Sequence, residues 1–372
     1  MVFIIPAGGQ GEKLWPYSRK DFPKTFQKLF GDRSLMRRIV DTLLKIAKPS
    51  DIYISTKGMY LDVVTKDIPE IPKENYLIEP NFFKNRGPGE GYAFMMLTII
   101  RPDEPFMIVQ PDCIREPEEK FLEMIKEMEK LVTRDKKFIS GGIPAINTEL
   151  GTDRGVDYLI LGEKINLNTN LEVYSVKQYV SREDTSPEAL KTVKENKVSA
   201  HSNHNCWYPE LMMAAYKKYR PDWYDSLMKI KSYVGKPNEK SAKGGPASGW
   251  EKTNEIYETM EPGATEEVTK HVFKDGYIIN HAFKWYDMGT WESVYLYLNK
   301  DGKYKPEGNT VSIDTKGTLV KTHGNKLVAT LGVKGLVIVE TDDVVLVADR
   351  KKVGDMKLVL EKIKEEKKDK YL

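Results

Sequence analysis

The first 145 residues alternate short apolar runs with stretches in which apolar residues recur at helical spacing. The runs of strand length are Val2–Ile5, Ile52–Ser55, Tyr76–Ile78, Phe106–Gln110 and Lys137–Ile143, and the helical stretches cover 35–44, 89–100 and 117–133. Strands that alternate with helices favour a mostly parallel sheet with helices on both faces. The pattern therefore predicts an α/β fold with a Rossmann-like sheet, whose ligands bind at the carboxyl ends of the strands.

The pattern changes twice further along the chain. From about 150 to 300 it is less regular, with antiparallel-type strands at Tyr158–Gly162 and Leu171–Val180 and aromatic helices near 208–230. A loop rich in glycine and proline at 231–249 is assigned no chemistry. From Val311 onward short β-rich runs recur, and a helix rich in Lys and Glu begins near Val353. We expect two domains, a larger one over 1–300 and a small β-rich one with a terminal helix over 301–372.

Composition narrows the class of protein. The 372 residues include 58 Lys and Arg against 55 Asp and Glu, a difference of 3, so no nucleic-acid surface is expected. Cys113 and Cys206 lie far apart and form no disulfide framework, which favours a reducing compartment. No stretch approaches the roughly 18–20 apolar residues of a membrane span, and Pro6 interrupts the apolar N-terminus. We expect a soluble cytoplasmic protein without a membrane partner.

The segment after the first apolar run is the strongest candidate for chemistry. Residues 6–24 form a glycine-rich turn, in which Gly8, Gly9 and Gly11 permit backbone conformations that other residues avoid. Consecutive N–H groups of such a turn can point at an anion. The cations that the sequence brings to the same turn are Lys13, Arg19, Lys20 and Lys24. The turn is therefore a candidate phosphate site.

Two common phosphate motifs do not fit this turn. A Walker loop needs Gly-Lys followed by Ser or Thr, which the turn lacks. A dinucleotide fingerprint needs a third glycine at the position of Leu14. A dinucleotide-dependent oxidoreductase is therefore a distant alternative.

Two aspartates are candidate metal ligands. Asp112 follows the fourth apolar run, where a parallel sheet opens to its ligand, and Asp287 lies within Trp285–Trp291. Magnesium takes few protein carboxylates and completes its shell with phosphate oxygens and water. Either aspartate alone is weak evidence, because aspartates after strands are often turn or cap residues. The glycine-rich turn, as a candidate phosphate site, strengthens the interpretation of both aspartates as metal ligands.

In order and approximate spacing these segments resemble sugar-phosphate nucleotidyltransferases, in particular the mannose-1-phosphate guanylyltransferases. Lys84–Pro88 is similar to the family's Arg-Asn-Thr-Ala-Pro, and Trp285–Trp291 to its Trp-x-Asp-x-Gly-Ser-Trp. Other segments that carry the likeness are Gly8–Pro16, Pro23-Lys24, Glu79-Pro80, Gln110–Asp112 and Val337–Val347. The resemblance extends to about residue 365. It implies a nucleotidyltransferase domain followed by a short domain that resembles a left-handed β-helix.

The resemblance also implies a reaction and a set of site residues. A nucleotidyl group passes from GTP to mannose-1-phosphate, pyrophosphate leaves, and GDP-mannose forms. The implied catalytic residues are Lys13, Lys24, Asp112 and Asp287, and the two aspartates hold the implied cofactor Mg²⁺. The implied nucleotide-binding residues are Ala7, Gly8, Gly9, Gly11, Asn85 and Pro88, and the implied sugar-phosphate residues are Asp157, Ser181, Arg182 and Asn203. The oligomeric state stays open, with a homodimer as one candidate.

The sugar side departs from the family pattern. Asp157 stands where the family has a glycine, Ser181 where it has a glutamate for the sugar hydroxyls, and Arg182 where it has a lysine. Lys13 replaces an arginine and loses the bidentate fork of that side chain. Another sugar-1-phosphate, another base, or a regulatory paralogue that binds nucleotide sugars without chemistry therefore remain alternatives. Lys24 and the two aspartates argue against the last of these.

Three further residues, His201, His204 and Cys206, have the side chains of metal ligands. Their spacing is not a recognised zinc pattern, and the sequence offers no evident fourth ligand. We expect them instead to be polar residues that line the sugar pocket.

Overall fold

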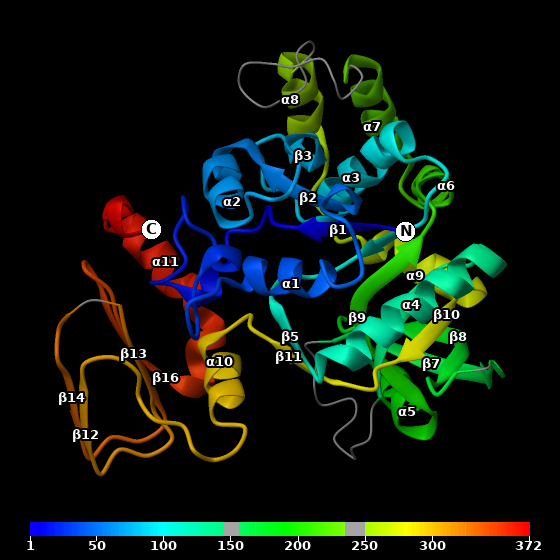
Figure 1. Cartoon of the computed structure of the whole chain (residues 1–372). Coiled ribbons are helices and arrows are strands. Elements are labelled where there is room, and N and C mark those ends of the chain that lie inside the picture. The colour runs from blue at the N-terminus through cyan, green and yellow to red at the C-terminus, as the bar shows by residue number, and fades with distance from the viewer. Residues whose placement is uncertain (145–155, 168, 235–249, 324) are drawn as a thin grey trace.

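The computed structural model describes residues 1–144, 156–167, 169–234, 250–323 and 325–372. Most of the described chain surrounds one central sheet, and the C-terminal strands form a smaller group beside it, drawn in orange in Figure 1. Most of the loop expected at 231–249 lies outside the described residues. Among the helices that the structure describes, none combines the length and the apolar character that crossing a bilayer requires.

The central sheet has nine strands in the order β3-β2-β1-β4-β9-β6-β10-β8-β7. The strands are β1 (Val2–Pro6), β2 (Ile52–Lys57), β3 (Tyr76–Glu79), β4 (Phe106–Ile108), β6 (Ile139–Pro144), β7 (Tyr158–Lys164), β8 (Val173–Val180), β9 (Val198–Trp207) and β10 (Tyr277–Asn280). The first four pair in parallel, as the alternating pattern predicts. The strands from the less regular part of the chain extend this sheet mainly in antiparallel pairs, apart from the parallel pair β10–β6.

Helices cover both faces of the parallel half. The side chains of β1 alternate between two cores, because successive residues of a strand point to opposite faces. Phe3 and Ile5 pack on the side of α1 (Leu35–Leu43) and α4 (Glu118–Asp135), and Val2 and Ile4 on the side of α3 (Arg86–Ile100). Further helices are α2 (Leu61–Asp67), α5 (Pro187–Glu195), α6 (Pro209–Tyr219), α7 (Pro221–Tyr233), α8 (Trp250–Thr259) and α9 (Glu266–Val272). This double cover explains why the first strands are apolar throughout.

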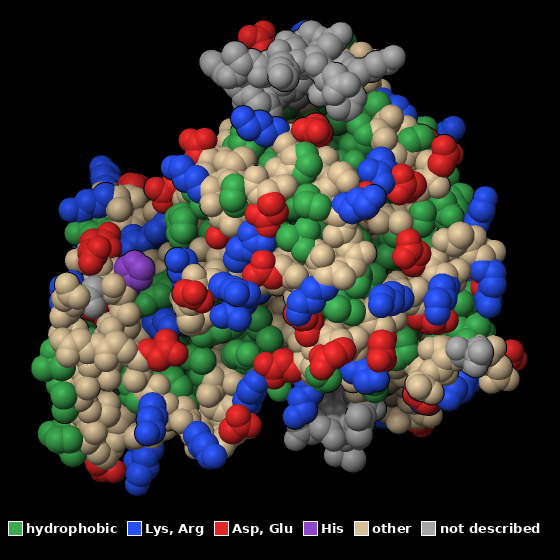
Figure 2. Space-filling model, viewed as in Figure 1, with side chains coloured by type: hydrophobic (Ala, Val, Ile, Leu, Met, Phe, Trp, Pro, Cys, Tyr) green, Lys and Arg blue, Asp and Glu red, His purple; other side chains and the backbone are tan. Residues whose placement is uncertain are grey.

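The C-terminal strands stack in a regular offset. They are β12 (Thr310–Ile313), β13 (Leu319–Thr322), β14 (Val328–Leu331), β15 (Leu336–Glu340) and β16 (Val345–Asp349), and α11 (Met356–Glu365) follows. Thr310 pairs with Val328 and Leu319 with Val337, both in parallel and both 18 residues apart (328 − 310 and 337 − 319). Such a constant offset is typical of coils stacked in a β-helix. Figure 2 shows apolar side chains along the outer edge of this region, and charges of both signs elsewhere on the visible face.

The C-terminal strands share their core with the glycine-rich turn. Leu14 and Trp15 pack in one apolar cluster with Trp291, at the start of α10 (Trp291–Leu298), and with Leu319 and Val337. The indole of Trp291 also donates to the carbonyl of Trp15 across 2.8 Å. The two parts of the chain are therefore joined at the turn that the sequence singles out.

Candidate active site

A cavity of about 610 Å³ lies where β1, β2 and β3 end. This is the edge at which the carboxyl ends of parallel strands meet, and α/β proteins bind ligands there. Nine of the predicted site residues line the cavity: Ala7, Gly8, Gly9, Gly11, Lys13, Lys24, Asn85, Asp112 and Asp287. Pro88 is buried in the first turn of α3 and does not line it.

The glycine-rich turn folds back on Lys24. Gly11 has φ +69°, which side-chain-bearing residues rarely adopt, and a Cβ atom added there would lie 2.5 Å from Cγ of Lys24. The Oγ of Ser18 donates to the Gly11 carbonyl across 2.6 Å and holds the turn in this shape. Glycine at this position therefore lets the stem of Lys24 pass beside the backbone into the cavity.

A two-stranded ribbon brings the two aspartates together. Asp112 immediately precedes β5 (Cys113–Glu116), Asp287 ends β11 (Lys284–Asp287), and the antiparallel register places Asp287 opposite Cys113. The N–H of Met288 donates to the Asp112 carbonyl across 2.8 Å. The Nζ of Lys24 contacts Oδ2 of Asp112. Three residues that are far apart in the sequence thus meet at one wall of the cavity.

Charge at this wall is unevenly matched. Burial raises the pKa of Asp287, and the Asp112 carboxylate adds to the shift in spite of Lys24. Burial also opposes ionisation of Asp112, but the Lys24 ammonium outweighs it and lowers the pKa of Asp112. Burial acts to lower the pKa of Lys24, and the two carboxylates reverse this and raise it. Lys24 and Lys13 only partly offset the burial of Asp287 and the charge of Asp112, so a further cation would stabilise the charged form of Asp287.

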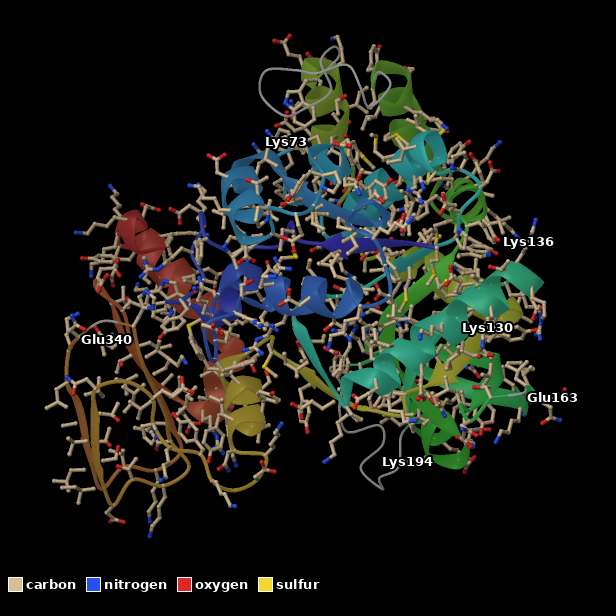
Figure 3. All side chains as sticks on the ribbon, viewed as in Figure 1. Lys73, Lys130, Lys136, Glu163, Lys194 and Glu340 are labelled. Carbon is tan, nitrogen blue, oxygen red and sulfur yellow. The ribbon has the colours of Figure 1, made fainter. Side chains whose placement is uncertain are left out.

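A buried ion pair forms another wall. Lys57 ends β2 and Glu79 ends β3, and the parallel register makes them direct partners. Their Nζ and Oε1 atoms lie 3.3 Å apart, with side chains 3% and 8% exposed. Lys57 also donates to the carbonyl of Phe82 across 2.7 Å, and the Tyr257 hydroxyl donates to Glu79 Oε2 across 2.7 Å. By contrast, the labelled Lys73 and Lys136 lie at the periphery of the molecule (Figure 3), and Lys130 is exposed on α4.

The expectation that Arg19 serves the phosphate turn is wrong. Its guanidinium is turned away from the cavity, donates to the carbonyl of Tyr371 across 2.6 Å and pairs with Asp343 across 2.7 Å. The indole of Trp15 donates to the same Tyr371 carbonyl across 2.7 Å. Arg19 therefore links the turn to the C-terminal residues, because the turn continues into the shared apolar core.

The four predicted sugar-phosphate residues lie beside the cavity and do not line it among the described residues. Asp157 accepts from Arg182 across 3.1 Å, and Ser181 and Arg182 line a small separate hollow. The amide of Asn203, with its nitrogen turned toward Glu266, donates to Glu266 Oε1 across 3.0 Å. Residues 145–155, which precede Asp157 in the sequence, are outside the described residues.

Several residues that line the cavity were not among the site residues predicted from the sequence. Lys57, Arg86, Glu90 and Thr290 line the cavity, as does Gln110, whose buried amide nitrogen has no partner among the described residues. Lys57 had a recognisable signal, since a lysine at the end of a buried strand needs a partner for its charge. Arg86 had a weaker one, because it stands where the resembled motif has threonine.

The two histidines and Cys206 serve different neighbours and do not line the cavity. His201 contacts the Asn205 side chain across 3.1 Å, His204 accepts from Arg115 across 3.0 Å, and Cys206 lies 3.5 Å from the Met1 sulfur. All three side chains are buried, and of the three His201 lies beside residues predicted for the sugar, because the Asn203 amide with its nitrogen turned donates to its Nδ1 across 3.3 Å. His201 also lies near the carboxylates of Asp157 and Glu266, close enough to share a metal ion, but arginine side chains already pair with both carboxylates.

Comparison with known proteins shows that nearly the whole chain is similar to proteins named mannose-1-phosphate guanylyltransferase. The family described as MannoseP isomerase/GMP-like beta-helix domain matches residues 308–363. The mannose-1-phosphate guanylyltransferase of Escherichia coli K12 is 26% identical, with 97% of this chain and 73% of that protein covered. The alginate biosynthesis protein AlgA of Pseudomonas fluorescens is 24% identical, with 96% and 70% covered.

Solved structures share the fold. A structure described as mannose-1-phosphate geranyltransferase from Thermus thermophilus superposes with a TM-score of 0.78 at 19% identity, covering 98% of this chain and 99% of that one. One described as mannose-6-phosphate isomerase from Helicobacter pylori gives a TM-score of 0.58 at 13% identity, covering 77% and 99%. The resemblance read from the motifs, the α/β class and the C-terminal β-helix-like region are therefore confirmed.

Proposed function

We propose that this chain is a nucleotidyltransferase that couples a nucleoside triphosphate to a sugar-1-phosphate, with GTP and mannose-1-phosphate as its substrates and GDP-mannose and pyrophosphate as its products. The observation that carries the proposal is the meeting of Lys24, Asp112 and Asp287 at one wall of a strand-end cavity. The near full-length likeness to mannose-1-phosphate guanylyltransferases supports the same reaction.

In this reaction an oxygen of the sugar-1-phosphate attacks the α-phosphorus of the triphosphate. The bond from that phosphorus to the bridging oxygen breaks, and pyrophosphate leaves with the electron pair. The attacking phosphate is already anionic, so no protein base is needed. The residues of the cavity must instead bring anions together and offset their charge.

Asp112 and Asp287 are the proposed ligands of Mg²⁺. Two neighbouring carboxylates, with the pKa of Asp287 raised by burial and by Asp112, support a site for a divalent cation, because added positive charge stabilises both ionised groups. Such an ion, when bound, supplies charge to the phosphate oxygens. Lys24 holds Asp112 in place, since its Nζ contacts Oδ2 of that carboxylate.

The remaining nucleotide-side residues have proposed roles that follow from their positions. Amides of the turn over Ala7–Gly11 bind the triphosphate, and Lys13 and Lys24 stabilise the charge that builds on pyrophosphate as it leaves. Asn85 and Pro88 belong to the segment beside the base, which they position.

On the sugar side, Asp157, Ser181 and Asn203 hold hydroxyl groups and Arg182 holds the phosphate. Both cysteines are free, in keeping with the proposed cytoplasmic location.

A substrate panel tests the function. Several sugar-1-phosphates, each combined with GTP, ATP, UTP and CTP, are assayed with Mg²⁺ for release of pyrophosphate. We expect the highest kcat/KM for mannose-1-phosphate with GTP. If another sugar-1-phosphate and nucleoside triphosphate release pyrophosphate faster, that pair replaces the proposed substrates. If no pair releases pyrophosphate, the result contradicts the proposal that the chain is an enzyme.

Another sugar-1-phosphate is the second candidate, and the altered sugar side favours it. Asp157 and Ser181 change both the size and the charge of the groups that the resembled family presents to the sugar. The same panel separates this candidate from the first. Both candidates predict release of pyrophosphate, but they differ in the sugar-1-phosphate that gives the highest kcat/KM.

A further inference from the structure

Three positions at which this chain differs from the resembled family lie in one network of charged side chains. Arg86 replaces a threonine of the family motif, Asp157 replaces a glycine and Arg182 replaces a lysine. In the structure Arg86 contacts Oε1 of Glu266, and Nη2 of Arg182 lies 3.1 Å from Asp157 and 3.6 Å from the same Oε1 of Glu266. Glu266 therefore connects the substituted positions.

Glu266 is placed so that two guanidinium groups face one of its oxygens. It lies at the start of α9 and is 6% exposed. Burial acts against its ionisation, but Arg86 and His201 lower its pKa to about 2, so it is charged at neutral pH. Its other oxygen, Oε2, is buried and has no partner among the described residues. The carboxylate thus holds both arginines through a single oxygen.

Arg86 lies at the border between this network and the cavity. It is the first residue of α3, its side chain is 33% exposed, and it lines the same cavity as Lys24 and Asp112. Its Nη1 donates to the Asn203 amide oxygen across 3.1 Å when that amide turns its nitrogen to Glu266. Arg86 therefore reaches from the nucleotide cavity to a residue predicted for the sugar.

An arginine pair of this kind matches a phosphate group. Guanidinium groups bind phosphate oxygens through two parallel hydrogen bonds, more strongly than neutral donors do. Two guanidinium groups that one carboxylate oxygen holds side by side can also donate together to a phosphate, because each guanidinium carries five N–H donors. A metal ion fits poorly here, because the Asp157 and Glu266 carboxylates that would hold it are already paired with the two guanidinium groups.

We propose that Arg86 and Arg182 together bind the phosphate of the sugar-1-phosphate, and that Glu266 positions the two guanidinium groups. This inference rests on the proposed function and identifies Arg86 as a second phosphate ligand on the sugar side. It also explains why lysine at the family position of Arg182 is replaced here. A pair of planar forks shares one anchoring carboxylate, which a flexible ammonium does less well.

Arg86→Thr, which restores the residue of the resembled motif, tests the proposal. We expect KM for mannose-1-phosphate to rise about 10-fold or more while KM for GTP stays within about 2-fold. Arg86→Lys keeps the charge without the fork and should lie between Arg86→Thr and the parent. The matched control is Arg220→Thr. Arg220 pairs with Glu267, which follows Glu266 on α9, and Arg220 does not line the cavity. We expect both KM values of this control to equal those of the parent.

The outcomes separate the inference from the proposed function. Parent KM for mannose-1-phosphate in Arg86→Thr, or a rise confined to GTP, overturns the role of Arg86 and leaves the function intact. If Arg86→Thr does not fold, Arg86→Lys decides by the same criterion. If the parent protein releases no pyrophosphate, the proposed function fails. In that case calorimetry with mannose-1-phosphate still tests the role of Arg86. The parent protein must bind mannose-1-phosphate, and Arg86→Lys must bind this ligand more weakly.

Discussion

The Nε–H of Arg115 donates a hydrogen bond to Nε2 of His204 across 3.0 Å. The same guanidinium donates to the carbonyls of Gln110 and Cys113, which lie on either side of Asp112, across 2.7 and 2.9 Å. Arginine has no acceptor, so Nε2 of His204 must carry a lone pair and the ring must be neutral. The turn that presents Asp112 to the cavity therefore depends on an uncharged, buried histidine.

Mild acid should destabilise the fold through this histidine and its neighbour His281. Burial, reinforced by Arg115, holds the pKa of His204 well below 6.5 and lowers that of His281 to about 3. Between pH 6.5 and 5 the unfolded chain therefore binds protons that the folded chain does not, so stability falls as the pH falls. We expect a loss of about 1 kcal/mol per pH unit for each histidine, measured by urea unfolding.

A histidine variant separates this effect from acid effects elsewhere. His281→Gln keeps a side chain that can reach the Ser202 hydroxyl, which lies 2.9 Å from the ring. Burial lowers the pKa of His201 as well, so the variant removes one of three such sites, and the slope of unfolding free energy against pH should fall by between about a third and a half. A parent curve that is flat between pH 6.5 and 5 would show that these histidines do not control the acid response.

Asp287→Asn should remove turnover without weakening the fold. The amide keeps the size of the side chain but loses the charge proposed to bind Mg²⁺, and we expect kcat to fall about 100-fold or more. Stability should be equal or higher, because the raised pKa shows that the charged form is disfavoured in the folded protein. Pyrophosphate release and thermal unfolding measure the two effects. Asp275→Asn, at an exposed position, is the control, and a parent rate for Asp287→Asn refutes the metal assignment.

Lys24→Met should slow the chemical step itself. The methionine keeps the apolar stem beside Gly11 and removes the ammonium that contacts Asp112. We expect the single-turnover rate to fall about 100-fold, as when one group that stabilises developing charge is lost. Lys73→Met removes a charge from an exposed position at the periphery (Figure 3) and should leave this rate unchanged. An unchanged single-turnover rate in Lys24→Met would exclude the proposed role.

The sequence predicts the nucleotide half of the cavity because its residues sit at strand ends. The turn after β1 and Asp112 each follow an apolar run, so local pattern alone places them at the same edge of a parallel sheet. The ion pair of Lys57 and Glu79 obeys the same logic, since these residues end adjacent strands in direct register. Reading strand ends for opposite charges would have found it.

Contacts between distant segments could not be read in this way. Arg86 and Glu266 are 180 positions apart, and Arg19 and Tyr371 are 352 apart. No local periodicity encodes which helix start faces which loop, because that depends on how whole elements pack. For the same reason the sequence suggests a division at residue 300 but does not show that Trp15 and Trp291 join the C-terminal strands in one core.

Trp15→Phe should weaken the glycine-rich turn and the binding of GTP together. Phenylalanine keeps most of the apolar contact but cannot donate to the Tyr371 carbonyl. We expect a loss of about 1 kcal/mol in unfolding free energy and a rise in KM for GTP. Trp207→Phe is the matched control, because its indole donates to the Lys136 carbonyl across 2.8 Å and Trp207 does not line the cavity. The control should lose stability without any change in KM, and equal KM effects in both variants would contradict the coupling.

Breaking the ion pair of Lys57 and Glu79 should be among the most destabilising changes in the cavity. Burial lowers the pKa of Lys57, so its charge is maintained against desolvation by Glu79. Removing one partner leaves the other buried and unpaired, and we expect Glu79→Gln or Lys57→Met to cost about 3 kcal/mol or more in urea unfolding. The double variant should cost less than the sum of the two single variants, because each single change leaves an isolated charge that the double change removes. The exposed pair of Lys120 and Glu123 should show coupling below about 1 kcal/mol. Additive costs at Lys57 and Glu79 would mean that the two side chains do not stabilise each other, and that the adjacent carbonyls and Tyr257 hold them separately.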